Sequence, residues 1–466
     1  MLRALGLDIP EGLPVGFAGI TADSRAVRPG MLYAALPGAR VDGRAFIADA
    51  VARGASAILA PFGTGWSGTV PLITAAEPRQ ALARLAALQA GPQPATVIAI
   101  TGTNGKTSTA EFLRQILAAA GQRAASLGTL GVTAPHDGSG AEATGPGLTT
   151  PDPVTLAETL AGLARTGVTT VAMEASSHGL EQFRLDGVRL AAAGFTNLTR
   201  DHLDYHGSLD AYRAAKLRLF QELLPPGAPA VAMADLEPRA LSGTGAQTVG
   251  EGGTLIRLMS ATPHSGGQTL ELESGGTRRT VTLALPGRFQ ADNALLAAGL
   301  ALVTETNPWP HLAGLTGVRG RMELAAESGG AAIYVDYAHT PDALTRLITA
   351  LRPHTQGRLH LVFGAGGDRD RGKRPLMGEA AQAADCVIVT DDNPRSEDPS
   401  SIRAAILAAC LGASEIGDRR TAIAAAMAGL RPGDVLAIAG KGHEQGQIMG
   451  AKTRPFDDVD TVRSLL

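Results

Sequence analysis

Residues 95–107 have the sequence ATVIAITGTNGKT, and this stretch sets the expected fold class of the 466-residue chain. Its first seven residues form an apolar run that is too short for a helix and is flanked by turn formers, which predicts a buried parallel strand. Apolar residues then recur at helical spacing from Phe112 to Leu117. A strand, a Gly-rich turn and a helix in this order are typical of an α/β domain whose loop cradles phosphate oxygens.

The Gly-rich loop contains the first candidate binding residues. We expect Lys106 to reach terminal phosphates and the Thr107 hydroxyl to bind Mg²⁺. Ile100 stands where the usual nucleotide-binding pattern has its first Gly, so an ordinary Gly turn with a solvated lysine is the alternative. The expected phosphate contacts are Gly102, Thr103, Asn104, Gly105, Lys106, Thr107 and Ser108.

Strand and helix patterns alternate along the rest of the chain, which predicts mostly parallel sheets with crossover helices. Residues 91–94 (GPQP) form a credible linker, and we expect three domains: 1–94, 95–322 and 323–466. Gly pairs between β-favouring runs in 249–285 suggest an antiparallel excursion. The expected strands are 95–101, 169–173, 190–195, 332–335, 359–363, 386–389 and 435–439; the expected helices are 79–90, 107–121, 209–224, 293–302, 399–411 and 420–430.

Composition excludes several classes of protein. The chain has 41 Lys and Arg against 44 Asp and Glu, and a formal charge of −3 offers no overall field for gripping nucleic acid. Its 44% hydrophobic and 18% charged residues argue against disorder. Cys386 and Cys410 are too few for a disulfide framework or a cysteine zinc site. We find no secretory start and no apolar run near the ~20 residues of a membrane span, so we expect a soluble cytoplasmic protein without nucleic-acid or membrane partners.

Further segments, taken with the shortened loop, resemble the Mur ligase family, whose members add amino acids to the peptidoglycan precursor. The segments are, in chain order, 173–179 (MEASSHG), 197–207 (NLTRDHLDYHG), 320–323 (GRME), 336–342 (DYAHTPD), 364–370 (GAGGDRD), 392–395 (DNPR) and 440–444 (GKGHE). The resemblance runs from residues 23–25 (DSR) to about Glu444, nearly the whole chain. Several long motifs in the right order are far more specific than one Gly-rich loop.

The resemblance implies both a domain plan and a reaction. It implies an N-terminal uridine-nucleotide-binding α/β domain, a central P-loop-type ATPase domain and a Rossmann-like C-terminal domain. The reaction is an amide synthesis that uses ATP and Mg²⁺, in which the D-Glu γ-carboxylate of UDP-MurNAc-L-Ala-D-Glu is phosphorylated and then attacked by an amine. Such a ligase serves cell wall biogenesis, cell shape and cell division. The oligomeric state is not readable, and a monomer is favoured.

Three candidate catalytic residues follow the phosphate loop in the central domain. Glu174 and His202 each lie just after an apparent strand, where ligands gather in open α/β sheets. From the residues alone, His202 is at least as well explained as a structural imidazole, and a lone Lys216 in a helix is usually solvated. The resemblance implies that Thr107, Glu174 and His202 contact metal and that Lys216 is carbamylated to N6-carboxylysine, an anionic oxygen ligand.

The remaining nucleotide contacts are implied by the resemblance alone. Asn293 would meet the adenine, Arg321 would stabilise the γ-phosphate as a catalytic cation, and Asp336 would hold the ribose. Each has an ordinary alternative: an N-terminal helix cap, a surface ion pair or a turn residue at a strand end.

Recognition of the two other substrates is also assigned through the resemblance. The UDP-linked substrate would contact Ala22, Ser24, Ala39, Arg40, Val41, Leu148, Thr149, Thr150, Ser176, Gln182 and Arg184. The amino acid would contact Arg369, Asp392, Asn393, Pro394, Arg395, Gly440 and Glu444. The 392–395 segment has the form associated with meso-diaminopimelate, because Arg395 can grip a second carboxylate bidentately while Glu444 holds the distal ammonium. Lysine or ornithine remains an alternative amine. The sequence of residues 392–395 is also typical of an ordinary turn without a binding role.

Functions of other classes make weaker fits. A dehydrogenase is suggested by residues 364–369, yet Arg369 stands where the dinucleotide fingerprint needs its third Gly. A non-catalytic nucleotide-binding module leaves Glu174, His202 and Lys216 unexplained. Folylpolyglutamate synthase shares the ATPase and C-terminal architecture but lacks the kind of uridine-binding domain that residues 23–25 suggest.

Overall fold

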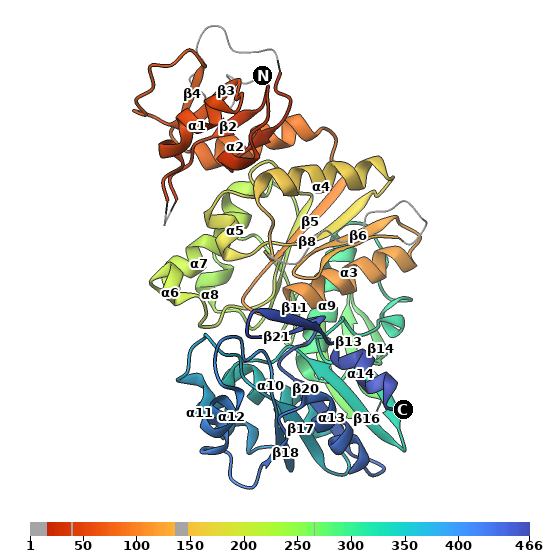
Figure 1. Cartoon of the computed structure of the whole chain (residues 1–466). Helices are drawn as coiled ribbons and strands as arrows, with labels where there is room; N and C mark the ends of the chain where they lie inside the picture. Colours follow the sequence, from red (N-terminus) through yellow and green to blue (C-terminus); the bar gives the residue numbers. More distant parts are fainter. Residues whose placement is uncertain (1–15, 39–40, 136–147, 265) are drawn as a thin grey trace. The chain divides into compact units, whose positions relative to one another are not determined.

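The computed structural model describes residues 16–38, 41–135, 148–264 and 266–466 (Figure 1). Ala39 and Arg40, two of the expected uridine contacts, lie outside the described residues. The chain divides into two compact units. Unit 1 contains the chain up to Val249 together with Leu296–Pro308, and unit 2 contains Gly250–Leu295 and Trp309–Leu466.

Unit 1 begins with a small parallel sheet in the order β1-β2-β3-β4. Apolar side chains such as Leu32, Leu59 and Ile73 on one face of this sheet pack with Leu82 and Leu85 of the following helix. A second apolar cluster, around Tyr33 and Ile58, covers the other face. The elements are β1 (Ile20–Thr21), β2 (Leu32–Ala34), β3 (Ala57–Pro61), β4 (Leu72–Ala75), α1 (Ile47–Ala52) and α2 (Pro78–Ala90), with short 3₁₀ turns at Ser24–Ala26 and Gly43–Phe46.

The larger sheet of unit 1 has the order β11-β10-β9-β5-β8-β6-β7 and is parallel except for β7. Its strands are β5 (Thr96–Thr101), β6 (Ala124–Gly128), β7 (Gly131–Thr133), β8 (Thr170–Glu174), β9 (Ala192–Phe195), β10 (Ala230–Met233) and β11 (Gln247–Gly250). Its helices are α3 (Lys106–Ala119), α4 (Pro153–Arg165), α5 (Ser177–Glu181), α6 (Leu203–His206), α7 (Leu209–Arg218) and α8 (Pro238–Leu241). The carboxyl ends of β5, β8 and β9 meet at one edge, where open α/β sheets bind ligands.

Unit 2 contains an antiparallel ladder and a second α/β sheet. The ladder is β12 (Ile256–His264), β13 (Gly267–Ser274) and β14 (Thr277–Leu283), which confirms the predicted antiparallel excursion. The sheet has the order β15-β16-β20-β17-β18-β19 and is parallel except for β15. Its strands are β15 (Glu323–Ser328), β16 (Ala331–Asp336), β17 (Leu359–Phe363), β18 (Cys386–Val389), β19 (Ser414–Glu415) and β20 (Val435–Ala439).

Helices cover both faces of the unit 2 sheet (Figure 1). One apolar core lies between the sheet and α10, α11 and α12, and the other lies between the sheet and α13 and α14. The helices are α10 (Pro341–Leu351), α11 (Lys373–Ala381), α12 (Pro399–Leu407), α13 (Arg419–Ala428) and α14 (Asp458–Ser464). Unit 2 also has the hairpin β21 (Gly446–Met449) with β22 (Lys452–Pro455) and 3₁₀ turns at Leu312–Gly314 and Arg352–His354. The helix α9 (Arg288–Val303) belongs to both units, because the division falls after Leu295.

Predicted and observed elements agree closely, with differences at their ends. The strands β17, β18 and β20 have the predicted bounds. The helix expected over 209–224 is regular only to Arg218 and continues as a π-helical turn at Leu219–Leu223, and the helix expected to reach residue 411 ends at Leu407. β5 begins at Thr96 and β15 at Glu323, but the three domain boundaries stay a prediction. In the described ranges no helix is long and apolar enough to cross a membrane.

Candidate functional site

The phosphate loop joins β5 to α3, as predicted. Gly102 and Gly105 have positive φ angles, 145° and 83°, which glycine adopts most readily. A Cβ atom at Gly102 would overlap the hydroxyl oxygen of Thr196. Lys106 is the first residue of α3, and its Nζ donates to the carbonyl oxygens of Gly102 at 3.0 Å and Thr103 at 2.8 Å. The loop therefore holds an ammonium group against its own backbone.

Two residues that follow β9 brace the loop. The Thr196 hydroxyl donates to the carbonyl oxygen of Asn104 at 2.6 Å, and the Asn197 side-chain oxygen accepts from the Asn104 N–H at 2.9 Å. No role was predicted for either residue from the sequence. They lie more than ninety residues from the loop in the chain, and no local pattern signals such a contact.

Glu174 ends β8 directly beside the phosphate loop. Its side chain is 2% exposed, and its Oε1 accepts from the Thr107 hydroxyl at 3.0 Å and from the Thr129 N–H at 2.7 Å. The Thr129 hydroxyl also reaches Oε2 at 3.2 Å. A Cβ at Gly128 would overlap this carboxylate, which explains a small residue there. Thr107 and Glu174 thus present adjacent oxygen atoms, the donors that Mg²⁺ prefers, so this pair fits the implied metal.

Lys216 of α7 is 1% exposed, so the solvated-face interpretation is wrong. Its Nζ donates to the Gly102 carbonyl oxygen at 2.7 Å and lies 4.3 Å from the centre of the Tyr212 ring. Burial, and next the positive charge of Lys106, lower the pKa of Lys216 well below its ordinary value. The geometry therefore favours an uncharged amine at the base of the phosphate loop.

His202 has different surroundings from the other expected metal contacts. It adopts a left-handed backbone conformation with φ 51° at the start of α6, and its side chain is 48% exposed. Its Nε2 is 3.5 Å from Asp201 Oδ2, and its ring centre is 4.8 Å from that of His178. Within the described ranges, no group of three or more His, Cys, Asp or Glu side chains is placed to hold a metal. The structure thus joins Thr107 to Glu174 directly, while the contacts it gives His202 are with other residues.

The residues expected to line the dipeptide of the substrate lie together in unit 1. Buried Thr150 donates from its hydroxyl to the Glu174 carbonyl oxygen at 3.0 Å and accepts from the Ser176 N–H at 3.0 Å. Arg184 donates to the Thr150 carbonyl oxygen and to Gln182 Oε1, both at 2.6 Å. Burial lowers the pKa of Arg184.

Two further expected contacts lie just before Thr150. The Thr149 hydroxyl accepts from that of Thr129 at 3.1 Å. Leu148 exposes 54% of its surface. An exposed leucine offers only its apolar surface or its backbone to a ligand.

The residues expected to contact the uridine end of the substrate have few polar side-chain groups that could bind it. Ala22 follows β1 and is exposed, and Ser24 begins a 3₁₀ turn that Asp23 caps. A hydrogen bond from Arg25 lowers the pKa of Asp23 to about 2. Val41 is 58% exposed. The structure places these residues at the surface of the small sheet, and their role stays a prediction.

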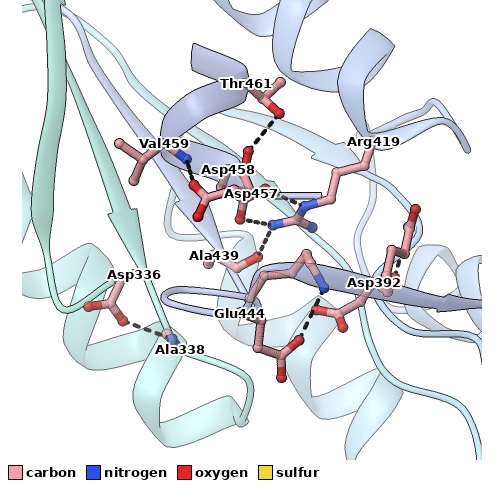
Figure 2. Close-up of polar contacts among 12 residues, drawn as sticks. Asp336, Ala338, Asp392, Arg419, Ala439, Glu444, Asp457, Asp458, Val459 and Thr461 are labelled. Carbon is pink, nitrogen blue, oxygen red and sulfur yellow. Dashed lines mark hydrogen bonds and ion pairs between the residues drawn. The ribbon is translucent and has the colours of Figure 1, made fainter. Parts of the chain in front are cut away.

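The expected nucleotide contacts of unit 2 are partly assembled. Asp336 ends β16, and one of its carboxylate oxygens accepts from the Ala338 N–H at 2.8 Å (Figure 2). The other oxygen accepts from the Met322 N–H at 2.7 Å. Burial raises the pKa of Asp336, and the Arg321 guanidinium opposes that rise. Arg321 lies over the Tyr337 ring at 4.7 Å, and among the described residues its buried Nε has no hydrogen-bond partner.

Asn293 lies inside a helix. It is 6% exposed, lies within α9, and donates to Gln290 Oε1 at 3.1 Å. The helix begins at Arg288, so the helix-cap alternative for Asn293 is wrong.

The expected amino-acid pocket comes together between β18, β20 and the β21 hairpin. Asn393 donates to Glu444 Oε2 at 2.8 Å, and a Cβ at Gly440 would overlap the Asp392 carboxylate. Arg395 has a left-handed backbone, φ 52°, and its Nη1 donates to the Gly367 carbonyl oxygen at 2.8 Å. The pocket residues therefore fix one another's positions.

The two remaining members of this expected pocket differ in exposure. Pro394 is buried, and a Cβ at Gly367 would overlap its carbonyl oxygen. Arg369 is exposed. A Cβ at Gly366 would lie 2.8 Å from Arg395 Nη1 and 3.8 Å from Arg369 Cγ, so both arginines flank the loop after β17.

A fully buried ion pair that was not predicted from the sequence supports this pocket. Arg419 donates to both carboxylate oxygens of Asp458 at 2.7 Å and to the Ala439 carbonyl oxygen at 3.0 Å. Figure 2 shows Asp392 and Glu444 beside this pair, and both carboxylates interact electrostatically with Arg419. The only signal in the sequence is two ordinary charged residues 39 positions apart.

Comparisons with known proteins agree along the chain. Three family models match: Mur ligase family, catalytic domain, over 16–89; Mur ligase middle domain, over 100–301; and Mur ligase, glutamate ligase domain, over 320–442. A protein of Caulobacter vibrioides named UDP-N-acetylmuramoyl-L-alanyl-D-glutamate--2,6-diaminopimelate ligase is 56% identical over 464 residues, covering 96% of this chain and 95% of the relative. A protein of the same name from Rhizobium meliloti is 51% identical, covering 98% of this chain and 95% of the relative.

Solved structures give the same result. A structure bearing that same enzyme name is 35% identical with a TM-score of 0.71, covering 96% of this chain and 94% of its own. The MurF ligase of Thermotoga maritima in complex with ADP is 20% identical with a TM-score of 0.62, covering 96% of each chain, which shows a shared fold. The matches confirm the predicted fold class, three α/β domains with mostly parallel sheets. The chain belongs to the Mur ligase family.

Proposed function

We propose that the protein is an ATP-dependent ligase that joins meso-diaminopimelate to the D-Glu γ-carboxylate of UDP-MurNAc-L-Ala-D-Glu during synthesis of the peptidoglycan precursor. The observation that carries this proposal is the burial of Lys216 against the phosphate loop. The names of relatives more than half identical to the chain support the choice of substrates. The cytoplasmic location and a monomeric state stay predictions.

An uncharged Lys216 is the form of the amine that reacts with CO₂. Its lone pair forms the N–C bond, one C=O π bond becomes an oxygen anion, and an amine proton leaves to solvent. The product is N6-carboxylysine, which replaces a potential cation by an oxygen ligand. The lowered pKa of Lys216 supports this modification, because an ammonium group has no free lone pair.

The oxygen donors at the loop fit a hard divalent cation. Thr107 and Glu174 are the residues proposed to hold Mg²⁺, together with His202 and the carbamate on Lys216. Bound Mg²⁺ would neutralise charge on the phosphates and so allow two anionic reactants to meet. A fully charged ammonium at Lys216 would repel this ion, which is a second reason to propose the carbamate.

The chain's cations and backbone N–H groups have a defined task in the reaction. A carboxylate is a poor electrophile until one oxygen becomes part of a leaving group, and phosphorylation of the γ-carboxylate achieves this while ADP leaves. The amine then attacks the acyl phosphate, an amide forms and phosphate leaves. Lys106 and the loop are proposed to hold the transferring phosphoryl group, and Arg321 to stabilise its charge.

The C-terminal pocket is proposed to select the amine. Arg395 would bind the distal carboxylate and Glu444 the distal ammonium of diaminopimelate. The contact between Asn393 and Glu444 supports a preformed pocket. Lysine or ornithine is the second candidate amine, because both carry a distal ammonium and the 392–395 segment alone does not exclude them.

An amine-panel assay tests this function. The purified protein is supplied with UDP-MurNAc-L-Ala-D-Glu, ATP and Mg²⁺, and phosphate release and tripeptide formation are followed with diaminopimelate, lysine and ornithine. We expect diaminopimelate to give the highest kcat/KM. A higher kcat/KM for lysine or ornithine would change the proposed amine substrate and leave the ligase assignment unchanged. Absence of phosphate release with every amine would favour a non-catalytic nucleotide-binding module, and folate turnover would indicate a folylpolyglutamate synthase.

A further inference from the structure

Lys441 is a fully enclosed cation at the candidate amino-acid pocket. It follows β20, and its side chain is 0% exposed. Its Nζ donates to the carbonyl oxygen of Gly446 at 2.6 Å, to Glu444 Oε2 at 3.1 Å and to Asn393 Oδ1 at 3.3 Å. Three acceptors for three N–H groups satisfy the ammonium completely.

The same contacts fix the Glu444 carboxylate. Oε2 accepts from Lys441 and from Asn393 Nδ2, which lies 2.8 Å away. Asn393 is held in turn, because its Oδ1 accepts from the Ile448 N–H at 2.9 Å. Among the described residues no donor reaches Oε1, and the Glu444 side chain is 33% exposed. One oxygen of the carboxylate is therefore anchored, and the other is left for a ligand.

We propose that Lys441 is a positioning residue that, through Glu444, sets the preference for an amino acid with a distal ammonium group. This inference rests on the proposed function, because it names how that ligase would read its amine. Lys441 itself touches no substrate. Its effect is to hold the reading carboxylate in one orientation before the amine arrives.

The physical case depends on the cost of a buried charge. A buried ammonium loses its hydration, so it is kept only where acceptors replace the lost water. Without Lys441, Oε2 would have one neutral amide donor, and a partly exposed glutamate would turn towards water. A carboxylate that is already held in place loses little conformational entropy when it binds an ammonium group. It therefore discriminates against an analogue without that ammonium more strongly than a mobile carboxylate does.

The test compares two amino acids that differ in one group. Both meso-diaminopimelate and L-2-aminopimelate have a distal carboxylate, but only diaminopimelate has the distal amine. The ratio of their kcat/KM values measures how well the distal ammonium is read. Lys441→Met is compared with Lys452→Met, the same change at an exposed position on β22. Glu444→Gln and the double variant Lys441→Met/Glu444→Gln complete a cycle.

We expect Lys441→Met to lower the ratio by roughly 10- to 100-fold, the range for loss of a hydrogen bond to a charged group. The loss should appear in KM for diaminopimelate, with KM for ATP unchanged. Glu444→Gln should lower the ratio comparably, the double variant should add little, and Lys452→Met should change nothing.

Several outcomes would overturn the proposal. An equal loss for both amino acids would make Lys441 a purely structural residue, and an unchanged ratio in Glu444→Gln would remove the carboxylate as the reader. If Lys441→Met does not fold, Lys441→Gln must show the same drop, because it keeps an N–H donor for Gly446 but removes the charge. A wild type that ligates no amine at all would instead overturn the proposed function, a separately visible result.

Discussion

Lys216 in unit 1 and Lys441 in unit 2 are equally buried but have opposite surroundings. Lys216 faces a carbonyl oxygen, an aromatic ring and the positive charge of Lys106. Lys441 faces a carboxylate, an amide oxygen and a carbonyl oxygen. Burial removes water from both, and only Lys441 has a carboxylate in hydrogen-bond contact to replace it. The partners of a buried lysine, and not its burial, decide whether it serves as a reactive amine or as a fixed cation.

Lys106→Ala should have the largest effect, because it removes the cation of the phosphate loop. We expect ligation to fall by ~10²–10³-fold, the usual loss for one preorganised transition-state donor. The change also removes one of the two effects that lower the pKa of Lys216, so this pKa should rise. Phosphate release under saturating substrates measures the first effect. Near-normal turnover in a folded variant would discard the phosphate-loop assignment.

Lys216→Ala should lose most activity and regain part of it when acetate or formate is added. An added carboxylate can take the place of the proposed carbamate, whereas it cannot replace a cation. The measurement is kcat with and without the carboxylate, and ¹³C-labelled bicarbonate should give a carbamate signal only in the wild type. A fully active Lys216→Arg variant would show that no carbamate is needed. Lys216 would then act as a cation, as Lys441 does.

The sequence predicted the elements that local patterns determine. The strands β17, β18 and β20 had the correct bounds because each is a short apolar run between turn formers. The helix that carries Lys216 was overextended, because the π-helical turn after Arg218 depends on how that segment packs and not on its own composition.

The phosphate loop of the candidate site was predictable from the sequence, but the side chains that hold the site residues in place were not. Gly102 and Gly105 are visible as glycines that a tight turn requires. Thr129 and Thr196 were missed, because their contacts with Glu174 and Asn104 join residues 45 or more positions apart that no periodicity connects. Lys441 was missed although Glu444 lies only three positions away, because nothing in the sequence shows that its side chain is buried. The family resemblance singled out Lys216, but only the structure showed that it is buried.

Arg395→Ala tests the same proposed pocket that Lys441 supports, through the distal carboxylate of diaminopimelate. Arg395 is partly exposed and already donates to Gly367, so we expect the low end of the range for a charge pair, about 2 kcal/mol or roughly 30-fold in kcat/KM for diaminopimelate. Use of lysine, which has no distal carboxylate, should change little, and KM for ATP should stay the same. Equal losses for diaminopimelate and lysine would contradict a carboxylate-binding arginine.

His443, two residues after Lys441, should affect the stability of unit 2 in a pH-dependent way. Burial, and then the charge of Arg321, lower the pKa of His443 to about 4, from an ordinary value of 6.5. Between these two values the unfolded chain binds more protons at this position than the folded chain does. The contribution to the unfolding free energy is therefore complete above pH 6.5 and is lost as the pH falls towards 4.

His443→Asn should flatten this part of the pH dependence, while the matched change His311→Asn should leave it as in the wild type. Urea unfolding between pH 4.5 and 7.5 in a Trp66→Phe background measures it, because Trp309 then reports on unit 2. An identical slope in wild type and His443→Asn would show that His443 is not desolvated as the structure indicates. A flatter slope in His443→Asn would show that burial lowers the pKa of a basic side chain in unit 2 when no carboxylate is in hydrogen-bond contact with it, as is inferred for Lys216 in unit 1. The difference between Lys216 and Lys441 would then be due to their hydrogen-bond partners and not to the unit in which each lies.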